Sequence, residues 1–325
     1  MDERITVAGP PDPMDKGQWR RSATPSVAVA RPFDPAPLME RLRRRVRTDT
    51  YRFAVFGDTH HSPAFERIGR RIREMGADFA LAAGDLVDLG GGREGPVNYG
   101  RLAERSGDFL RALPVWPAVG NHDADSRWDQ DVWNGFANFR AFFNLPPHYR
   151  FAFRNAEFLA LSWMLPDERE LDWLRRCLAD RRAEHLFVTA HWPLFRPHAV
   201  GDEPEAQGRL QGQLRSLLAE NGATAHFSGH THIHYRTVRD GVTYLVSGGA
   251  GRELSVLPDL DAALPGDSWI GRRPGDGGYV LHTPAAERTS AEATFFFVMI
   301  DVSGAAVRGR LISADGAALE EFSLT

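Results

Sequence analysis

The sequence predicts an α/β sandwich with a mixed β-sheet. Short apolar segments alternate with amphipathic helical patterns up to about residue 222, and β patterns dominate after that point. This alternation is typical of sheets covered by helices. With 42% hydrophobic and 10% aromatic residues, the 325-residue chain can bury a large core, which excludes disorder over most of its length. The length allows either two domains or one large α/β domain.

The first 50 residues differ from the rest of the chain. They are rich in proline and charge, and they show no steady hydrophobic period before residues 38–47, which carry a run of arginines. We therefore predict a partly flexible N-terminal arm over residues 1–50 and one domain over residues 51–325. The arginine run is expected to expose a solvated charged face, as a short helix that covers the domain. A contact with nucleic acid or lipid is the alternative.

The domain is expected to open with a strand and a capped helix. Residues 51–57 predict a buried strand because they are few, apolar and rich in aromatics. Ser62 and Pro63 supply an N-cap and a first-turn proline for the helix, which Gly76 ends. The next expected strands are at 79–83 and 114–119.

Strand and helix patterns continue through the second half. The expected elements are a hairpin of 149–153 and 157–162, a helix over 167–180 capped by Asp167, a strand at 186–190, a helix ending near Asn221, a strand at 223–228, a hairpin of 235–239 and 242–246, and strands at 293–302, 306–313 and 319–324. Residues 90–100 and 252–288 are expected to be long loops, which are often functional in compact domains.

Composition narrows the function classes. The net charge is −4, and no basic stripe follows Arg41–Arg47, so a nucleic-acid partner is not expected. The single cysteine, Cys177, excludes an internal disulfide framework and a thiolate zinc cluster, and it is expected to pack on a buried helix face. No apolar run approaches the ~18 residues of a membrane span. Residues 1–50 also lack the apolar core of a signal peptide, so we expect a cytoplasmic protein.

Side chains able to bind metal follow five of the predicted strands. The set consists of Asp58, His60, Asp85, Asn121, His191, His230 and His232. In open α/β sheets this edge is where ligands bind. Oxygen and imidazole donors suit Mn, Fe, Zn, Co or Ni better than an ion that prefers thiolates. Seven donors are too many for one four-coordinate ion but suit two ions that share a carboxylate, and two such ions would leave a net positive charge for an anionic substrate.

The order of these motifs resembles the calcineurin-like metallophosphoesterases. The motifs are Asp-x-His at 58–60, Gly-Asp-x-x-Asp at 84–88, Gly-Asn-His-Asp at 120–123, His191, and Gly-His-x-His at 229–232. The resemblance implies a four-layer α-β-β-α sandwich with two mixed sheets and a pair of divalent or mixed-valence metal ions. It assigns Asp58, His60, Asp85 and His232 to the first ion, and Asp85, Asn121, His191 and His230 to the second. It also implies that His122 contacts the substrate and protonates the leaving group, with Asp123 orienting its ring.

Departures from the family pattern narrow the subfamily. Leu89 stands where protein phosphatases of the family have an arginine, and Asp123 stands where they have glutamate. Asp88 replaces the tyrosine ligand of the purple acid phosphatases, and His60 replaces the glycine of their first motif, so an iron-loaded form should lack the purple absorption band. The remaining pattern is similar to bacterial cyclic-nucleotide and glycerophosphodiester phosphodiesterases.

We therefore expect hydrolysis of small phosphate esters, with phosphodiesters ahead of monoesters, by in-line attack of a hydroxide that bridges two metals. A phosphomonoesterase or a nuclease of the same superfamily is the alternative. A metal-binding scaffold without activity is the least favoured interpretation. A homo-oligomer is left open.

Other side chains near the motifs have two interpretations each. Asp88 is expected to support the ligands or to lie beside a helix, with direct metal binding as the alternative. His61 and His234 are expected to face solvent or to support the ligands, with a substrate contact as the alternative. Trp192 either walls the site or packs in the core, and His226 is expected to be a hydrogen-bonded core histidine. The aromatic stretch at 128–143 is expected to be a core helix, with a lid over the site as the alternative.

Overall fold

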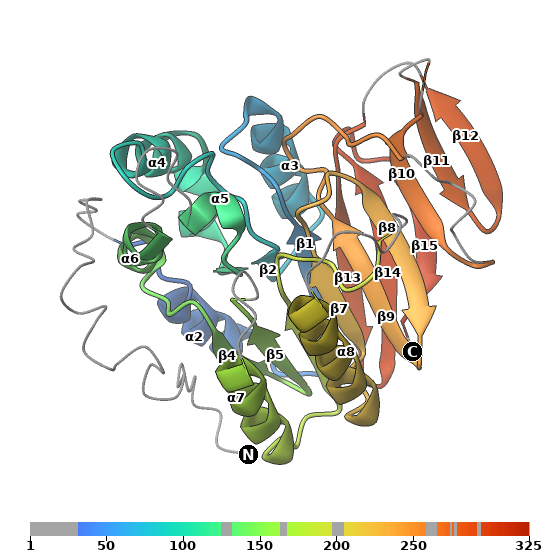
Figure 1. Cartoon of the computed structure of the whole chain (residues 1–325), viewed down its shortest axis with the longest axis horizontal. Coiled ribbons are helices and arrows are strands. Elements are labelled where there is room, and N and C mark those ends of the chain that lie inside the picture. Colours follow the sequence, from blue (N-terminus) through green and yellow to red (C-terminus); the bar gives the residue numbers. More distant parts are fainter. Residues whose placement is uncertain are drawn as a thin grey trace.

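The computed structural model describes residues 32–124, 132–162, 168–196, 205–257, 265–273, 275, 278–290 and 294–324. Two mixed sheets pack face to face, with helices over their outer faces (Figure 1). The predicted four-layer sandwich is thus confirmed. In the described part of the chain, no helix is both long and apolar enough to cross a bilayer.

The first sheet, sheet A, has the order β15-β14-β13-β1-β2-β3. Its strands are β1 (Thr50–Phe56), β2 (Phe79–Ala82), β3 (Val115–Pro117), β13 (Phe296–Ser303), β14 (Ala306–Ser313) and β15 (Ala318–Ser323). β1, β2 and β3 run parallel, and β13 joins β1 antiparallel. The parallel half carries the first three sequence motifs at its carboxyl edge.

The second sheet, sheet B, has the order β12-β11-β10-β8-β9-β7-β6-β5-β4. Its strands are β4 (Tyr149–Phe153), β5 (Ala156–Ala160), β6 (His185–Thr189), β7 (Ala225–Ser228), β8 (His234–Arg239), β9 (Val242–Ser247), β10 (Ser268–Arg272), β11 (Tyr279–Thr283) and β12 (Ala286–Ser290). β5, β6, β7 and β9 form its parallel centre. The last two motifs follow β6 and β7.

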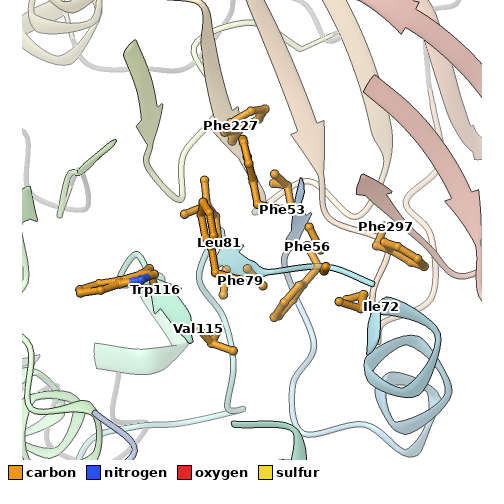
Figure 2. Packing of buried hydrophobic residues seen from close by; sticks show 14 of the residues in the cluster. Phe53, Phe56, Ile72, Phe79, Leu81, Val115, Trp116, Phe227 and Phe297 are labelled. Atoms are coloured by element: carbon orange, nitrogen blue, oxygen red, sulfur yellow. The ribbon is translucent and has the colours of Figure 1, made fainter. Parts of the chain in front are cut away.

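Aromatic side chains fill the space between the sheets. Phe53 of β1 stacks on Phe79 at 5.2 Å between ring centroids and lies beneath Phe227 of sheet B (Figure 2). Its ring meets those of Phe158, Phe187 and Phe227 edge-on. Edge-to-face pairs of this kind add to the ~1.5–3 kcal/mol that full burial of each ring contributes. This interior fixes the two sheets relative to each other and so fixes the edge where the motifs meet.

Helices cover the outer faces. α3 (Pro63–Glu74) and α4 (Gly95–Ala112) lie on sheet A, where Phe65 packs against Phe56. As predicted, the Ser62 hydroxyl accepts the amide of Ala64 at the start of α3. α7 (Glu168–Ala179) and α8 (Glu205–Glu220) cover sheet B and share with it a second apolar cluster that includes Cys177. The cap residue predicted for α7, Asp167, lies outside the described residues.

Two segments predicted as loops contain regular structure. α4 begins at Gly95, and the predicted 252–288 loop contains β10, β11 and the first residues of β12. A Cβ at Gly95 would lie 2.4 Å from the carbonyl oxygen of Gly90, so glycine at this position is a packing requirement and not the sign of a loop. β12 is exposed along its whole length and therefore lacks the apolar alternation that marks a half-buried strand.

The chain before residue 51 is partly built onto the domain. Residues 1–31 of the predicted arm lie outside the described residues. α2 (Ala36–Arg45) is the predicted short helix, and it packs through Met39 and Leu42. Arg43 departs from the expected solvated face because it is only 5% exposed and donates to the carbonyl of Ala152.

Two further predictions concern single side chains or stretches. The aromatic stretch forms α6 (Val132–Phe143), where Phe139, Phe142 and Phe143 are buried, which favours the core helix over the lid. Residues 125–131 lie outside the described part.

His226 is buried as expected but not hydrogen-bonded, because neither ring nitrogen has a partner among the described residues. Burial alone lowers its pKa to about 3, so the ring is neutral and acts as an apolar core residue.

Candidate metal centre

The residues of all five motifs lie at the carboxyl ends of strands, as predicted. Asp58 and His60 follow β1, Asp85 follows β2, Asn121 opens α5 (Asn121–Ala124) after β3, His191 follows β6, and His230 and His232 follow β7. The sandwich brings the edges of the two sheets together, since both carboxylate oxygens of Asp58 accept the backbone amide of His230, at 3.1 and 3.0 Å. The site therefore spans the junction of the two sheets.

The donor atoms of these residues fall into overlapping groups. Within each group the atoms lie no more than 4.8 Å apart, and the groups are Asp58, His60 and His232; His60, Asp85 and His122; and Asp58, Asp85 and His191. Asp85 thus lies near His60 on one side and near His191 on the other. That is the position expected for a carboxylate shared by two ions.

Asn121 completes the half of the site that faces sheet B. Its Oδ1 lies 3.0 Å from Nε2 of His191 and 3.0 Å from Nδ1 of His230. The same His191 nitrogen lies 3.2 Å from Oδ2 of Asp85. Donors that are each about 2.0–2.2 Å from one ion lie about 3 Å from one another, so this spacing suits a shared metal.

Hydrogen bonds fix which nitrogen of His60 and of His191 faces the centre. Nδ1 of His191 donates to the carbonyl of Ala83 at 2.7 Å, which leaves Nε2 facing Asp85. Nδ1 of His60 lies 3.1 Å from a carboxylate oxygen of Asp88, while its Nε2 is buried without a partner among the described residues. A buried nitrogen without a partner is costly unless something occupies the space before it. Rings held in this way are typical of metal-ligating histidines.

The backbone is strained at the same residues. Of the eight described non-glycine residues with positive φ, five belong to or adjoin the motifs: Asp58, His60, His61, Asp85 and His230. Such conformations cost roughly 1–3 kcal/mol each and persist only where the surroundings impose them. The strand ends are therefore held in a conformation that aims side chains at one point.

Two motif glycines are required by close approach. A Cβ at Gly120 would lie 2.1 Å from Oδ1 of Asp85, and one at Gly229 would lie 2.4 Å from Oδ2 of Asp58. The glycines at these positions allow the backbone to run directly against the carboxylates.

The electrostatics of the site fit bound cations. Asp58 is fully buried; burial and the nearby Asp85 carboxylate raise its pKa well above the ordinary value, which a divalent ion would reverse. Burial lowers the pKa of His230 to about 3 and that of His232 to about 4, which keeps both rings neutral, as ligation requires. Against the opposing effect of burial, Asp85 raises the pKa of His191 to about 9. Two carboxylates, one amide and four imidazoles thus fit two ions of the oxygen- and nitrogen-binding class.

His122 and Asp123 lie at the centre, but not in the predicted relation. Nδ1 of His122 hydrogen-bonds the carbonyl of Asp88 at 2.5 Å, and its amide donates to Asp85 at 2.8 Å. The buried carboxylate of Asp123 instead accepts backbone amides of Gly120 and of residues 85–87. Asp123 therefore holds two motif loops together, and the Asp88 carbonyl orients His122.

Three of the four accompanying residues lie at the site. Asp88 contacts His60, and its other oxygen lies 3.5 Å from Nε2 of His61. Trp192 stacks on His230 with ring centroids 4.8 Å apart, so it forms a wall of the centre. Asp88 thus supports the expected ligand His60, and His61 contacts Asp88 in turn.

His234 is not part of the centre. Its Nε2 lies 3.2 Å from the hydroxyl of Ser268 and 3.5 Å from Glu320, in a buried cluster that joins sheet B to β15. Two residues after His232 the chain has already entered β8, so the side chain of His234 points into the sandwich. The prediction for this residue was wrong because sequence proximity to a motif does not determine the direction of a side chain.

The sequence analysis expected a functional loop from residue 252 onward, but it assigned no role to Arg252 or to the glycines before it. Residues 248–255 run along the centre, where the amide of Ser255 donates to the carbonyl of His232. Arg252, from this segment, reaches Asp88. The available signal was the Gly-Gly-Ala-Gly run directly after a predicted strand, since closely spaced glycines indicate close backbone approach.

A paired-sheet sandwich with a strained cluster of carboxylate, amide and imidazole donors at its edge defines a metal-dependent hydrolase fold. The family model described as calcineurin-like phosphoesterase matches residues 51–234, and the chain belongs to that family. The expected superfamily is therefore confirmed.

Curated relatives include tartrate-resistant acid phosphatases type 5. The protein of Homo sapiens is 26% identical over 216 residues, which is 56% of this chain and 64% of that protein. The rabbit (Oryctolagus cuniculus) protein is 25% identical over 262 residues, 67% of this chain and 78% of that protein. The chain thus spans less than two thirds of the human relative.

Solved structures share the fold. A purple acid phosphatase from yellow lupin superposes with a TM-score of 0.60 at 16% identity, covering 85% of this chain and 54% of that one. A structure of PhoD gives a TM-score of 0.54 at 10% identity, covering 86% of this chain and 69% of that one. The curated relatives are acid phosphatases, so the expected similarity to bacterial phosphodiesterases is not supported.

Proposed function

We propose that this protein is a dinuclear metal-dependent phosphomonoesterase acting on small phosphate esters. The observation that carries the proposal is the meeting of seven oxygen and imidazole donors at one buried edge of the sandwich. The curated relatives are acid phosphatases, and this likeness favours monoesters as substrates of the protein over the diesters that the motifs predicted. The monoester alternative therefore replaces the diester interpretation.

The residues fit two ion positions. Asp58, His60, Asp85 and His232 would hold one ion, and Asp85, Asn121, His191 and His230 the other. When bound, such ions activate water and neutralise charge on a phosphoryl group. Mn, Fe, Zn, Co and Ni all suit these donors, and Asp88 at the position of the purple tyrosine keeps the expectation that an iron-loaded form lacks the purple absorption band.

His122 is proposed to donate the proton to the leaving oxygen. Its Nδ1 is bonded to the Asp88 carbonyl, so Nε2 is the free nitrogen of the ring. Its backbone amide, bonded to Asp85, fixes the ring beside the predicted shared carboxylate. A positioned proton donor of this kind contributes about 10²–10⁴-fold to a hydrolysis.

The test compares p-nitrophenyl phosphate with bis-p-nitrophenyl phosphate, using Mn²⁺-reconstituted full-length protein of measured metal content. We expect two ions per chain and a higher kcat/KM for the monoester. A higher kcat/KM for the diester would instead support a phosphodiesterase. No hydrolysis of either ester, with two ions bound, would contradict the proposal.

A further inference from the structure

The segment after β9 is built to lie against the metal centre. A Cβ at Gly251 would lie 2.1 Å from the carbonyl oxygen of Thr59, and one at Gly248 would lie 2.9 Å from Oδ2 of Asp58. The amide of Ala250 donates to the carbonyl of Gly57. The next residue after this glycine run, Arg252, is therefore placed beside the loop that carries Asp58 and His60.

The guanidinium of Arg252 lies at the rim of the centre. Its Nη2 is 2.5 Å from Oδ1 of Asp88, the same oxygen that lies 3.1 Å from Nδ1 of His60. Arg252 and the expected ligand His60 thus share one carboxylate oxygen at the rim.

The contacts of Arg252 involve only part of its guanidinium. Its side chain is 45% exposed, and Asp88 is its one hydrogen-bond partner within the described ranges. A guanidinium carries five N–H donors in a planar fork that matches phosphate oxygens. Asp88 contacts only Nη2 of the guanidinium, and its oxygens also face His60 and His61. Donors therefore remain for an anion on the open side.

We propose that Arg252 binds the phosphoryl group of the substrate and favours a monoester dianion over a diester. This inference rests on the proposed function, and it assigns the choice between monoesters and diesters to Arg252. A monoester phosphate has three terminal oxygens and nearly two negative charges near pH 7. A diester has two terminal oxygens and one charge. An added cation at the rim stabilises the bound dianion more, since the Coulomb energy scales with the ligand charge.

The test is Arg252→Ala in the Mn²⁺-reconstituted full-length protein, with Arg252→Lys beside it. Loss of one charge-assisted hydrogen bond corresponds to about a 10- to 100-fold change. We expect this loss in kcat/KM for p-nitrophenyl phosphate, mainly through KM, and a loss of about threefold or less for bis-p-nitrophenyl phosphate. Lysine should recover part of the loss, because it keeps the charge but not the fork.

Arg101→Ala is the matched control. Arg101 is an exposed arginine of α4 on the His61 side of the centre, and no hydrogen bond or ion pair joins it to the described site residues. Its removal deletes the same charge, and both esters should change by no more than about twofold. A second readout is independent of turnover: calorimetric titration with inorganic phosphate should show weaker binding to Arg252→Ala by a similar factor, at unchanged metal content.

Three results would overturn the inference. Equal losses for both esters with unchanged phosphate binding would make Arg252 a positioning residue that acts through Asp88. Loss of bound Mn²⁺ in Arg252→Ala would assign it to metal loading, and unchanged kinetics would remove it from the site. A wild-type protein that hydrolyses no monoester would instead contradict the proposed function, and the phosphate titration would still test Arg252.

Discussion

Two buried polar clusters of this molecule handle charge in opposite ways. At the metal centre, Asp58, Asp85 and Asp123 are buried together, and no arginine or lysine pairs with them in the described part of the chain. In the cluster between β8, β10 and β15, Glu320 is paired with Arg236 at 2.5 Å and accepts the hydroxyl of Ser268 at 2.8 Å.

The electrostatics reflect this difference. Burial raises the pKa of Asp58, and the neighbouring carboxylate adds to the effect. Burial also raises the pKa of Glu320, but the hydrogen bond of His234 and the charge of Arg236 outweigh this effect and lower the pKa to about 2. The first cluster contains no arginine or lysine, and the proton that Asp85 holds on His191 would be displaced by a bound cation, whereas the carboxylate of the second cluster is already paired with Arg236. Buried carboxylates that lie together therefore indicate an ion site when no arginine or lysine pairs with them.

The largest expected effect comes from Asp85→Asn, which removes the carboxylate shared by the two proposed ion positions. Both ions should be lost, and turnover should fall by more than the ~10²–10⁴-fold that a single proton donor contributes. Metal analysis and kcat measure the two effects. Retention of two ions per chain would contradict the shared position of Asp85.

His122→Ala should lower kcat by about 10²–10⁴-fold while two ions stay bound. Because the proposed role is protonation of the leaving oxygen, the loss should be smaller for p-nitrophenyl phosphate than for an alkyl phosphate, whose leaving group needs the proton more. Equal losses for both substrates would argue against proton donation by His122.

Glu320→Gln should affect stability and leave metal binding intact. Removing one partner of a buried ion pair costs about 3–5 kcal/mol, because Arg236 is left without its counter-charge. Urea unfolding measures this change. The exposed neighbour Glu321 provides the control, and Glu321→Gln should change the free energy of unfolding by no more than about 0.5 kcal/mol. A loss of metal in Glu320→Gln would erase the distinction between the clusters.

The smallest expected effect is a pH dependence of stability in acid. The pKa of Glu320 falls from 4.5 to about 2 on folding, so its contribution is present above pH 4.5 and is lost as the pH falls through 2. The contribution is on the order of 3 kcal/mol at most. The free energies of unfolding of the wild type and of Glu320→Gln should be measured at pH 5 and at pH 3. The difference between the two proteins should be smaller at pH 3. A constant difference would refute this assignment.

The position of the centre could be predicted from the sequence because it depends on the order and direction of the strands. Ligands such as Asp58, Asp85 and His191 follow apolar strands, and parallel strands present their carboxyl ends at one edge. The two-sheet packing followed from the family resemblance and was confirmed.

The missed features depend on register and exposure. β12 has no buried face, so its five residues carry no alternation. The amides that Asp123 accepts are backbone groups, which leave no trace in residue identity. Arg252 matters because glycines bring its segment against Thr59, and His234 does not because β8 has begun by that point.

The pairing of β1 has a consequence for how the chain folds as it is synthesised. β1 lies at the centre of sheet A, yet one of its two neighbours is β13, with Thr50 opposite Ser303. All the ligand residues precede β13 in the sequence, so they leave the ribosome while one edge of β1, the strand that leads to Asp58 and His60, is still unpaired. An unpaired central edge of this kind invites pairing with other chains. Pairing across so long a sequence separation also slows folding. We therefore expect the C-terminal strands to limit the rate at which nascent chains reach a competent centre.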